Sequence, residues 1–244
     1  MNLVAKLQSL TNQTCRDEDG GEWKLKLLPP MSDAEIAALE KKLPCPMPAD
    51  IRAALKFARG VENNVGDRVE IAALDDSGFG IEEIFPFAHA LANDGAGNFW
   101  VVDLLPDSTA WGPVYFACHD APVIIYQSAD VAEFLDAYLK LEQSPGKDKG
   151  PLHQVAEIAV GAVWANEPNK LDRAEALAKG DVELKTFAES LDDSWRIFDL
   201  RNAKTGDGFA WGRAKSPDDI TRWKTLPIFA YKPKKSLMKR LFGK

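Results

Sequence analysis

Residues 92–104 read ANDGAGNFWVVDL, in which a polar, glycine-bearing stretch leads directly into an apolar one. Gly and Asn tolerate the positive φ angles that tight turns require, and the residues from Phe99 to Val102 are apolar enough to be buried. The stretch therefore predicts a tight turn that opens a buried β-strand. A P-loop would need a Lys in this turn, a dinucleotide-binding loop would be followed by a helix, and a calcium loop would need more acids than Asp94.

Short segments rich in β-branched and aromatic residues lie on both sides of this turn. Gly, Pro, Asn and Asp bound them, and the gaps between them are too short for crossover helices. We therefore expect an α+β fold whose central sheet is largely antiparallel and flanked by helices. The expected strands lie within residues 69–74, 80–91, 98–104, 113–118 and 122–128.

Three amphipathic patterns predict the flanking helices. The first follows Ser32, which together with Glu35 has the spacing of a capping box. A proline-rich elbow at 44–48 separates it from the second helix, which Gly60 is expected to end in a left-handed conformation. The third is expected to have Ser128 as its N-cap. These helices are expected at residues 32–43, 48–60 and 128–143.

The chain beyond residue 143 has a different pattern. A polar stretch with Gly and Pro predicts a linker, and helical patterns followed by aromatic strands predict a C-terminal α+β extension. Two of these strands are expected to form a hairpin within 195–213. The sequence thus predicts an N-terminal helical segment (1–29), a domain (30–143), a linker (144–151), an α+β extension (152–231) and a basic tail (232–244).

Charge is distributed unevenly along the chain, whose net charge is −7. Residues 69–139 contain twelve acidic residues and no Lys or Arg, whereas the last fourteen residues contain six basic residues and no acid. An acidic surface repels phosphates and attracts basic proteins, so we expect a basic protein partner and no nucleic acid. Two alternatives stay open: the acids only solvate strand edges, and the basic tail touches an anionic membrane surface.

The sequence shows no pattern that predicts a metal, cofactor or catalytic site. The three histidines share no metal-ligand spacing, and adjacent residues such as Cys118 and His119 point to opposite faces of a strand. Acid pairs such as Glu82-Glu83 are more typical of solvated turns than of a hydrolase. Three cysteines, an odd number, favour a reducing compartment, and there is no apolar run of about 18 residues. We therefore expect a cytoplasmic protein without cofactors.

Four stretches, taken in order, resemble the SUKH superfamily, which is named partly after a fungal cell-wall regulator. Residues 34–62 resemble its opening pair of helices, and residues 92–104 resemble its glycine turn and central strand. Residues 112–120 resemble its next strand, and residues 128–139 resemble its closing helix. The resemblance covers about residues 30–140, and it rests on the order and spacing of these stretches.

This resemblance implies a non-enzymatic α+β binding domain. Bacterial members act as immunity proteins that neutralise toxins, many of them nucleases, and fungal relatives are regulatory scaffolds. We therefore expect an immunity protein that binds a basic partner, such as a nuclease toxin, through an acidic surface. A regulatory scaffold related to cell-wall regulators and a carboxylate-dependent hydrolase are the alternatives. The candidate partner-binding residues are Asp75, Asp76, Glu82, Glu83, Asp94, Asp103, Asp107, Trp111 and Asp120.

Overall fold

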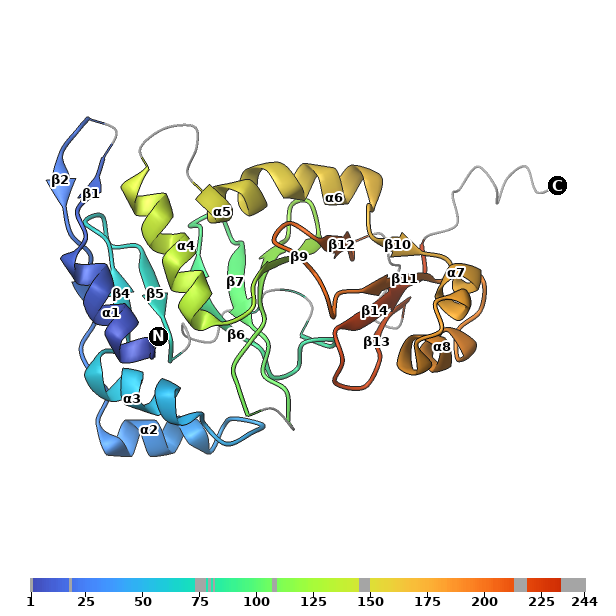
Figure 1. Cartoon of the computed structure of the whole chain (residues 1–244), viewed down its shortest axis with the longest axis horizontal. Coiled ribbons are helices and arrows are strands. Elements are labelled where there is room, and N and C mark those ends of the chain that lie inside the picture. The colour runs from blue at the N-terminus through green and yellow to red at the C-terminus, as the bar shows by residue number, and fades with distance from the viewer. Residues whose placement is uncertain are drawn as a thin grey trace.

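The computed structural model has the expected α+β fold, with helices on one face of a central antiparallel sheet and a second sheet packed against the other face (Figure 1). The structure describes residues 2–17, 19–72, 78, 80, 82–106, 109–144, 150–212 and 219–233. Residues 145–149 of the predicted linker and residues 234–244 of the basic tail therefore lie outside the described residues.

Five antiparallel strands form the central sheet, in the order β12-β9-β8-β7-β6. The predicted turn joins β6 to β7, and Gly95 and Gly97 have φ angles of 75° and 90° within it. The turn and the buried strand after it are therefore confirmed. The strands are β6 (His89–Asn93), β7 (Phe99–Val102), β8 (Val114–Cys118), β9 (Val123–Ser128) and β12 (Gly208–Ala210).

Helices share a hydrophobic core with one face of the central sheet. Side chains alternate along a strand, so Trp100 and Val102 belong to this core while Val101 belongs to the opposite face. The ring of Trp100 lies 4.9 Å from that of Phe116 and 6.1 Å from that of Phe134, measured between centroids. The helices are α1 (Leu3–Asn12), α3 (Ala49–Phe57), α4 (Val131–Gln143), α5 (Gly150–His153), the π-helix η1 (Gln154–Ala159) and α6 (Val160–Asn166).

The opposite face packs against a second antiparallel sheet, which has the order β10-β11-β14-β13. Val101 and Tyr115 of the central sheet share one buried cluster with Phe198, Phe229 and Tyr231 of the second sheet. Because both faces of the central strands are buried, their sequences are largely apolar and do not alternate regularly in hydropathy. The strands are β10 (Lys170–Leu171), β11 (Arg196–Asp199), β13 (Ile220–Arg222) and β14 (Ile228–Tyr231).

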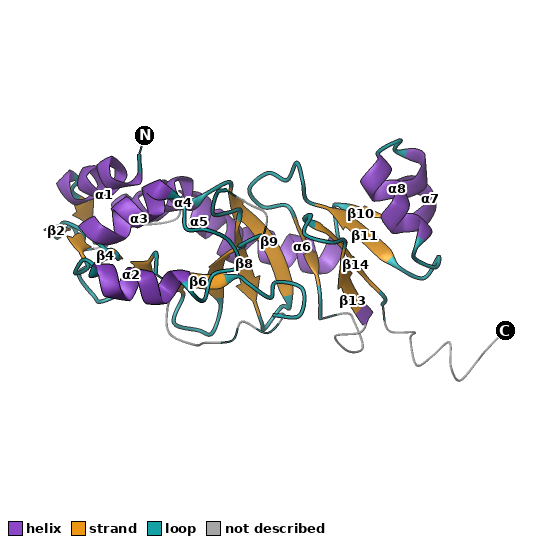
Figure 2. Ribbon diagram, turned by 90° about the horizontal axis from the view of Figure 1, so that it is seen from below, coloured by secondary structure: helices purple, strands orange, loops and turns teal. Residues whose placement is uncertain are grey.

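Smaller elements lie at the two ends of the molecule. Strands β3, β4 and β5 form a three-stranded sheet, and β1 pairs with β2. Helices α7 and α8 pack on the outer face of the second sheet, far from α1 (Figure 2). The elements are β1 (Cys15–Arg16), β2 (Glu22–Trp23), β3 (Lys26–Leu27), β4 (Gly60–Glu62), β5 (Arg68–Glu70), α2 (Asp33–Glu40), α7 (Arg173–Ala178) and α8 (Val182–Glu189). Within the described parts of the chain, no helix has the length and apolar character of a membrane span.

The start of α2 is as predicted, but the end of α3 is not. The Ser32 side chain accepts a hydrogen bond from the backbone of Glu35, whose carboxylate accepts one from the backbone of Ser32, so the capping box is confirmed. Helix α3 ends at Phe57, and Gly60 is the first residue of β4. A Cβ atom at Gly60 would lie 1.9 Å from the carbonyl oxygen of Val69, so this glycine serves close strand pairing and not a helix end.

Two further local predictions are wrong. Ser128 is the last residue of β9, and Asp130 caps α4 by accepting a hydrogen bond of 2.8 Å from the backbone of Glu133. The hairpin expected within 195–213 does not form, because β11 belongs to the second sheet and β12 pairs with β9 of the central sheet. Each strand buries its aromatic residues against a partner that is distant in sequence.

Two expected strands are shorter than the sequence pattern suggested. Strand β5 starts at Arg68, ends at Glu70 and belongs to the three-stranded sheet. Within 80–91, β6 begins only at His89, and the described residues before it form turns. Pro86 lies in this irregular part, where it has no backbone N–H to donate to a strand partner.

Candidate interaction site

The predicted site residues that the structure describes do not all lie on one exposed surface. Asp75, Asp76 and Asp107 lie outside the described residues. Glu82, Glu83, Asp94 and Asp120 are exposed, whereas Asp103 and Trp111 are only 1% and 3% exposed. The structure therefore separates them into exposed acids, one buried acid and one aromatic residue in the wall of a pocket.

Two exposed acids meet where the β6–β7 turn lies beside the β8–β9 turn, at one end of the central sheet. Asp94 accepts hydrogen bonds from the backbone of Ala96 (2.9 Å) and from the side chain of Asn98 (2.6 Å). Asn98 Oδ1 in turn accepts a hydrogen bond of 3.0 Å from the backbone of His119, whose Nε2 lies 3.1 Å from Asp120 Oδ1. We call Asp94, Asn98, His119 and Asp120 the sheet-end cluster. It presents two carboxylates on a rigid support, which suits contact with a basic protein.

Asp103 was expected on the recognition surface, and this expectation is wrong. Its carboxylate is paired with Arg222 of β13, with Oδ2 2.7 Å from Nη2 and Oδ1 3.2 Å from Nη1. The same guanidinium donates to the carbonyl oxygens of Ile84, Thr225 and Leu226 at 3.0–3.1 Å. Burial raises the pKa of Asp103, and the hydrogen bonds and charge of Arg222 oppose this shift. Asp103 thus fastens the second sheet to the central sheet and is not available to a partner.

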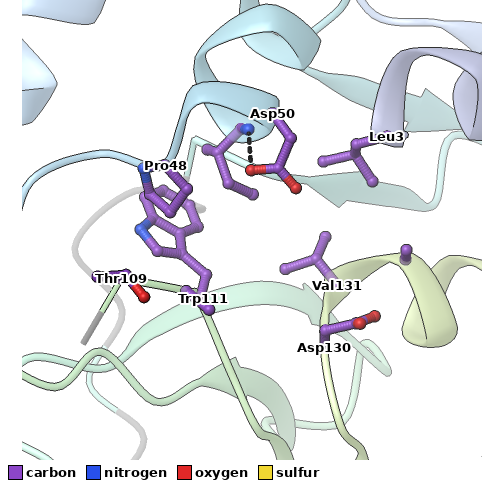
Figure 3. A pocket seen from close by; sticks show the side chains of 10 residues that line it. Leu3, Pro48, Asp50, Thr109, Trp111, Asp130 and Val131 are labelled. Atoms are coloured by element: carbon purple, nitrogen blue, oxygen red, sulfur yellow. Dashed lines mark hydrogen bonds between the residues drawn. The ribbon is translucent and has the colours of Figure 1, made fainter. Parts of the chain in front are cut away.

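Trp111 lines a cavity of about 250 Å3 where three helices begin (Figure 3). Leu3 of α1, Pro48 and Asp50 at the start of α3, and Val131 of α4 form the other walls. Asp50 accepts a hydrogen bond of 2.9 Å from the backbone of Ile51, as Figure 3 shows. This Trp111 pocket has an apolar wall and a polar rim, the combination found in small pockets that receive a partner's side chain.

Both aspartates at the rim of the Trp111 pocket support local helix structure. Asp130 is the N-cap of α4, and Asp50 lies in the first turn of α3, where a carboxylate interacts favourably with the helix dipole. Within the described residues, the indole nitrogen of Trp111 has no hydrogen-bond partner, and its ring lies edge-on to His89 at 4.9 Å between centroids. Both carboxylates therefore have structural roles at the starts of two helices.

The candidate acids Asp94 and Asp103 do not share a site. Asp94 lies before one end of β7, and Asp103 is buried beyond the other, about 17 Å away at about 3.3 Å per strand residue. Among the described residues, no group of three or more His, Cys, Asp and Glu side chains could hold a metal ion. The acid pair Glu82-Glu83 is exposed on an irregular segment.

One stretch of the chain, which includes the turn before β7, matches a known family. Residues 30–137 match the model of the SMI1 / KNR4 family (SUKH-1). This part of the chain matches the SUKH superfamily, and we call residues 30–137 the SUKH domain. It runs from just before α2 into α4 and so contains four of the five central strands. A comparison with curated proteins found no match to the chain. The SUKH superfamily includes immunity proteins and cell-wall regulators, and the SMI1 / KNR4 family is generally non-enzymatic.

The segments outside the SUKH domain complete its core. Strand β12 extends the domain's central sheet, and Phe209 of β12 stacks on Phe198 and Phe229 at 5.4 and 5.0 Å between centroids. Sequence reasoning missed Arg222 and Asn98, which position Asp103 and the sheet-end cluster. A single Arg or Asn carries no local pattern, so only the fold brings each beside its partner.

Proposed function

We propose that the chain is a non-enzymatic protein-binding module of the immunity type, which neutralises a basic toxin by covering it with an acidic surface. The observation that supports this most is a set of exposed acids that have no Lys or Arg partner among the described residues. Within the described residues, no Lys or Arg lies within 4 Å of Glu83, Asp94 or Asp120. Other acids of the same stretch are used internally, such as Glu70 beside Arg68.

An acidic surface of this kind acts mainly on the rate and specificity of association. A toxin that cleaves nucleic acid needs a basic face to hold phosphates, and carboxylates on a rigid sheet end are attracted to the same face. The attraction between exposed charges is screened within about 8 Å at physiological ionic strength, so binding should weaken as salt rises. No chemical step is required, because covering the toxin's substrate-binding face is sufficient.

The proposed site of action is the cytoplasm. Cys15, Cys45 and Cys118 are all free and buried, and burial raises the pKa of Cys15 and Cys45. Buried thiols of this kind are compatible with a reducing compartment, where disulfides are rare.

The experiment uses the full chain and the protein encoded by the gene directly beside its own, each purified separately. We expect a complex that inhibits this protein's toxic activity and whose dissociation constant rises about tenfold between 50 and 500 mM NaCl. The Glu83→Gln/Asp120→Asn variant should weaken binding about fivefold, since each exposed charge contributes roughly 0.2–1 kcal/mol. The matched control is Glu157→Gln/Glu189→Gln, which removes two exposed acids of η1 and α8 and should leave binding unchanged. Failure to form a complex, or a complex insensitive to salt, would refute the proposal.

A further inference from the structure

A second hollow lies at the C-terminal end of α4, where the SUKH domain meets the segments outside it. A cavity of about 220 Å3 opens between β5, the end of β6 and the last turns of α4. Its floor is apolar and includes Ala92, Trp100, Leu141 and Leu152. Its charged lining consists of three carboxylates, those of Asp67, Asp94 and Glu142, and the side chain of Arg68. An apolar floor with a carboxylate rim is suited to a long side chain that is apolar along its stem and positive at its tip.

This cavity continues into a neighbouring one around the end of α4. The second cavity, of about 300 Å3, shares Asp67, Leu141 and Glu142 with the first. It is bordered by Trp23 of β2 and by Val65, whose side chain is 77% exposed in the β4–β5 turn. We call the two cavities together the α4 groove. Its length permits contact with more than one residue of an extended partner segment.

The carboxylates of the α4 groove are held by neutral donors. The side-chain nitrogen of Asn63 donates to Asp67 at 3.1 Å and to Glu142 at 3.2 Å, and Tyr138 is hydrogen-bonded to Glu142. Burial raises the pKa of Glu142, these hydrogen bonds oppose the shift, and the charge of Asp67 adds to it. Among the described residues, no Lys or Arg is within 4 Å of either carboxylate. Asp67 and Glu142 therefore share a partly enclosed site in which the described residues pair neither carboxylate with a cation.

Two arginines line the groove, Arg68 in the first cavity and Arg16 in the second, and both already have acidic partners. Arg68 donates to Glu62 at 2.9 Å and lies 3.8 Å from Glu70, and Arg16 pairs with Glu22 at 2.9 Å. The groove also lies at the C-terminal end of a 13-residue helix, where the helix dipole favours a positive charge. The proposed function supplies such a cation, because it expects a basic protein partner.

We propose that the α4 groove docks an arginine side chain from a basic segment of a partner protein. The guanidinium group bridges Asp67 and Glu142, and the aliphatic stem lies over Leu141 and the ring of Trp100. This inference rests on the proposed function, since it assigns the basic partner a specific contact. Arginine is preferred to lysine because its planar fork can donate to two carboxylates at once.

The test measures arginine binding directly on the full chain. N-acetylarginine methylamide is titrated into isotope-labelled protein at 50 mM NaCl, and amide and indole NMR signals are followed. The matched probe is N-acetylcitrulline methylamide, which has nearly the same shape and no charge. We expect the arginine probe to shift the signals of Ala92, Trp100 and Leu141, and the citrulline probe to bind at least fivefold more weakly. Equal binding of the two probes, or shifts spread over all exposed acids, would overturn the proposal.

Two charge-neutralising variants separate this inference from the proposed function. Asp67→Asn/Glu142→Gln should weaken arginine binding at least fivefold, whereas Glu83→Gln/Asp120→Asn, with the same number of charges removed elsewhere, should not. If the partner protein binds the Asp67→Asn/Glu142→Gln variant as tightly as the natural chain, the groove assignment is wrong and the proposed function stands. If the arginine probe occupies the groove but no basic protein forms a complex, the proposed function is wrong and the groove remains a cation site.

Discussion

Replacing Arg222 by Met should destabilise the protein strongly, because it leaves the carboxylate of Asp103 buried and unpaired. Removing one partner of a buried ion pair costs about 3–5 kcal/mol, a large part of the 5–15 kcal/mol that holds a typical domain folded. The carbonyl oxygens of Ile84, Thr225 and Leu226 would also lose their donor. For a urea dependence of about 3 kcal/mol per M, the unfolding midpoint should fall by about 1–2 M.

The control for this prediction is Arg16→Met, which breaks the pair between Arg16 and Glu22 on the surface. Both side chains of that pair are about 60% exposed, so the expected loss is below about 1 kcal/mol. The deficit of Arg222→Met should be smaller at pH 4.5 than at pH 7.5. In the variant nothing opposes the burial that raises the pKa of Asp103, so the acid can be protonated at low pH and the cost of the buried charge disappears.

Urea unfolding followed by tryptophan fluorescence measures the midpoint shifts of the two variants and their dependence on pH. If Arg222→Met and Arg16→Met shift the midpoint equally, Asp103 and Arg222 do not fasten the two sheets together. A deficit that is the same at both pH values would show that an unpaired carboxylate is not its cause. The Asp103→Leu/Arg222→Met variant should recover part of the loss, because it replaces both charges by apolar side chains.

Two further predictions concern a glycine and a histidine of the SUKH domain. Gly60→Ala should lower the free energy of unfolding by several kcal/mol, since its Cβ would lie 1.9 Å from the Val69 carbonyl oxygen. The control Gly161→Ala on α6 places its Cβ in open space and should stabilise the protein by about 0.5–1 kcal/mol. Thermal unfolding of both variants tests this prediction, and equal effects would contradict it. Burial lowers the pKa of His89 to about 4, below the value near 6.5 of an unfolded histidine. The stability that neutral His89 contributes is therefore present above pH 6.5 and is lost as the pH falls toward 4. By pH 5 the loss in unfolding free energy amounts to about 2 kcal/mol. His89→Gln should show a correspondingly smaller fall in unfolding free energy between pH 7.5 and pH 5, and an unchanged fall would refute the assignment.

Local features of the fold were predictable because neighbours in sequence determine them. The turn before Phe99 needs only glycines that adopt positive φ, and the capping box needs only Ser32 and Glu35 three positions apart. The order and spacing of several such local signals were enough to point to the SUKH family, and the match over residues 30–137 confirms this. The prediction of Ser128 as a cap failed because Asp130, two residues later, offers an equally good capping side chain.

The candidate site was predictable only in part. The exposed acids at Asp94 and Asp120 follow from polar turns at one end of an antiparallel sheet, which the strand pattern indicates. The groove beside Glu142 did not follow, because its residues come from β5, β6 and α4 and share no local spacing. Asp103 looked like the neighbouring acids in sequence, yet its position directly after a buried strand places it between the two sheets.

By itself the sequence determined which segments form helices, turns and strands, because hydrophobic period and capping residues act over a few positions. Only the tertiary structure decided which sheet each strand joins and which charges are neutralised. Arg222 is 119 residues from Asp103, and β12 is more than 80 residues from its partner β9. Such contacts depend on how two apolar faces exclude water together, and no stretch of a few residues specifies that outcome.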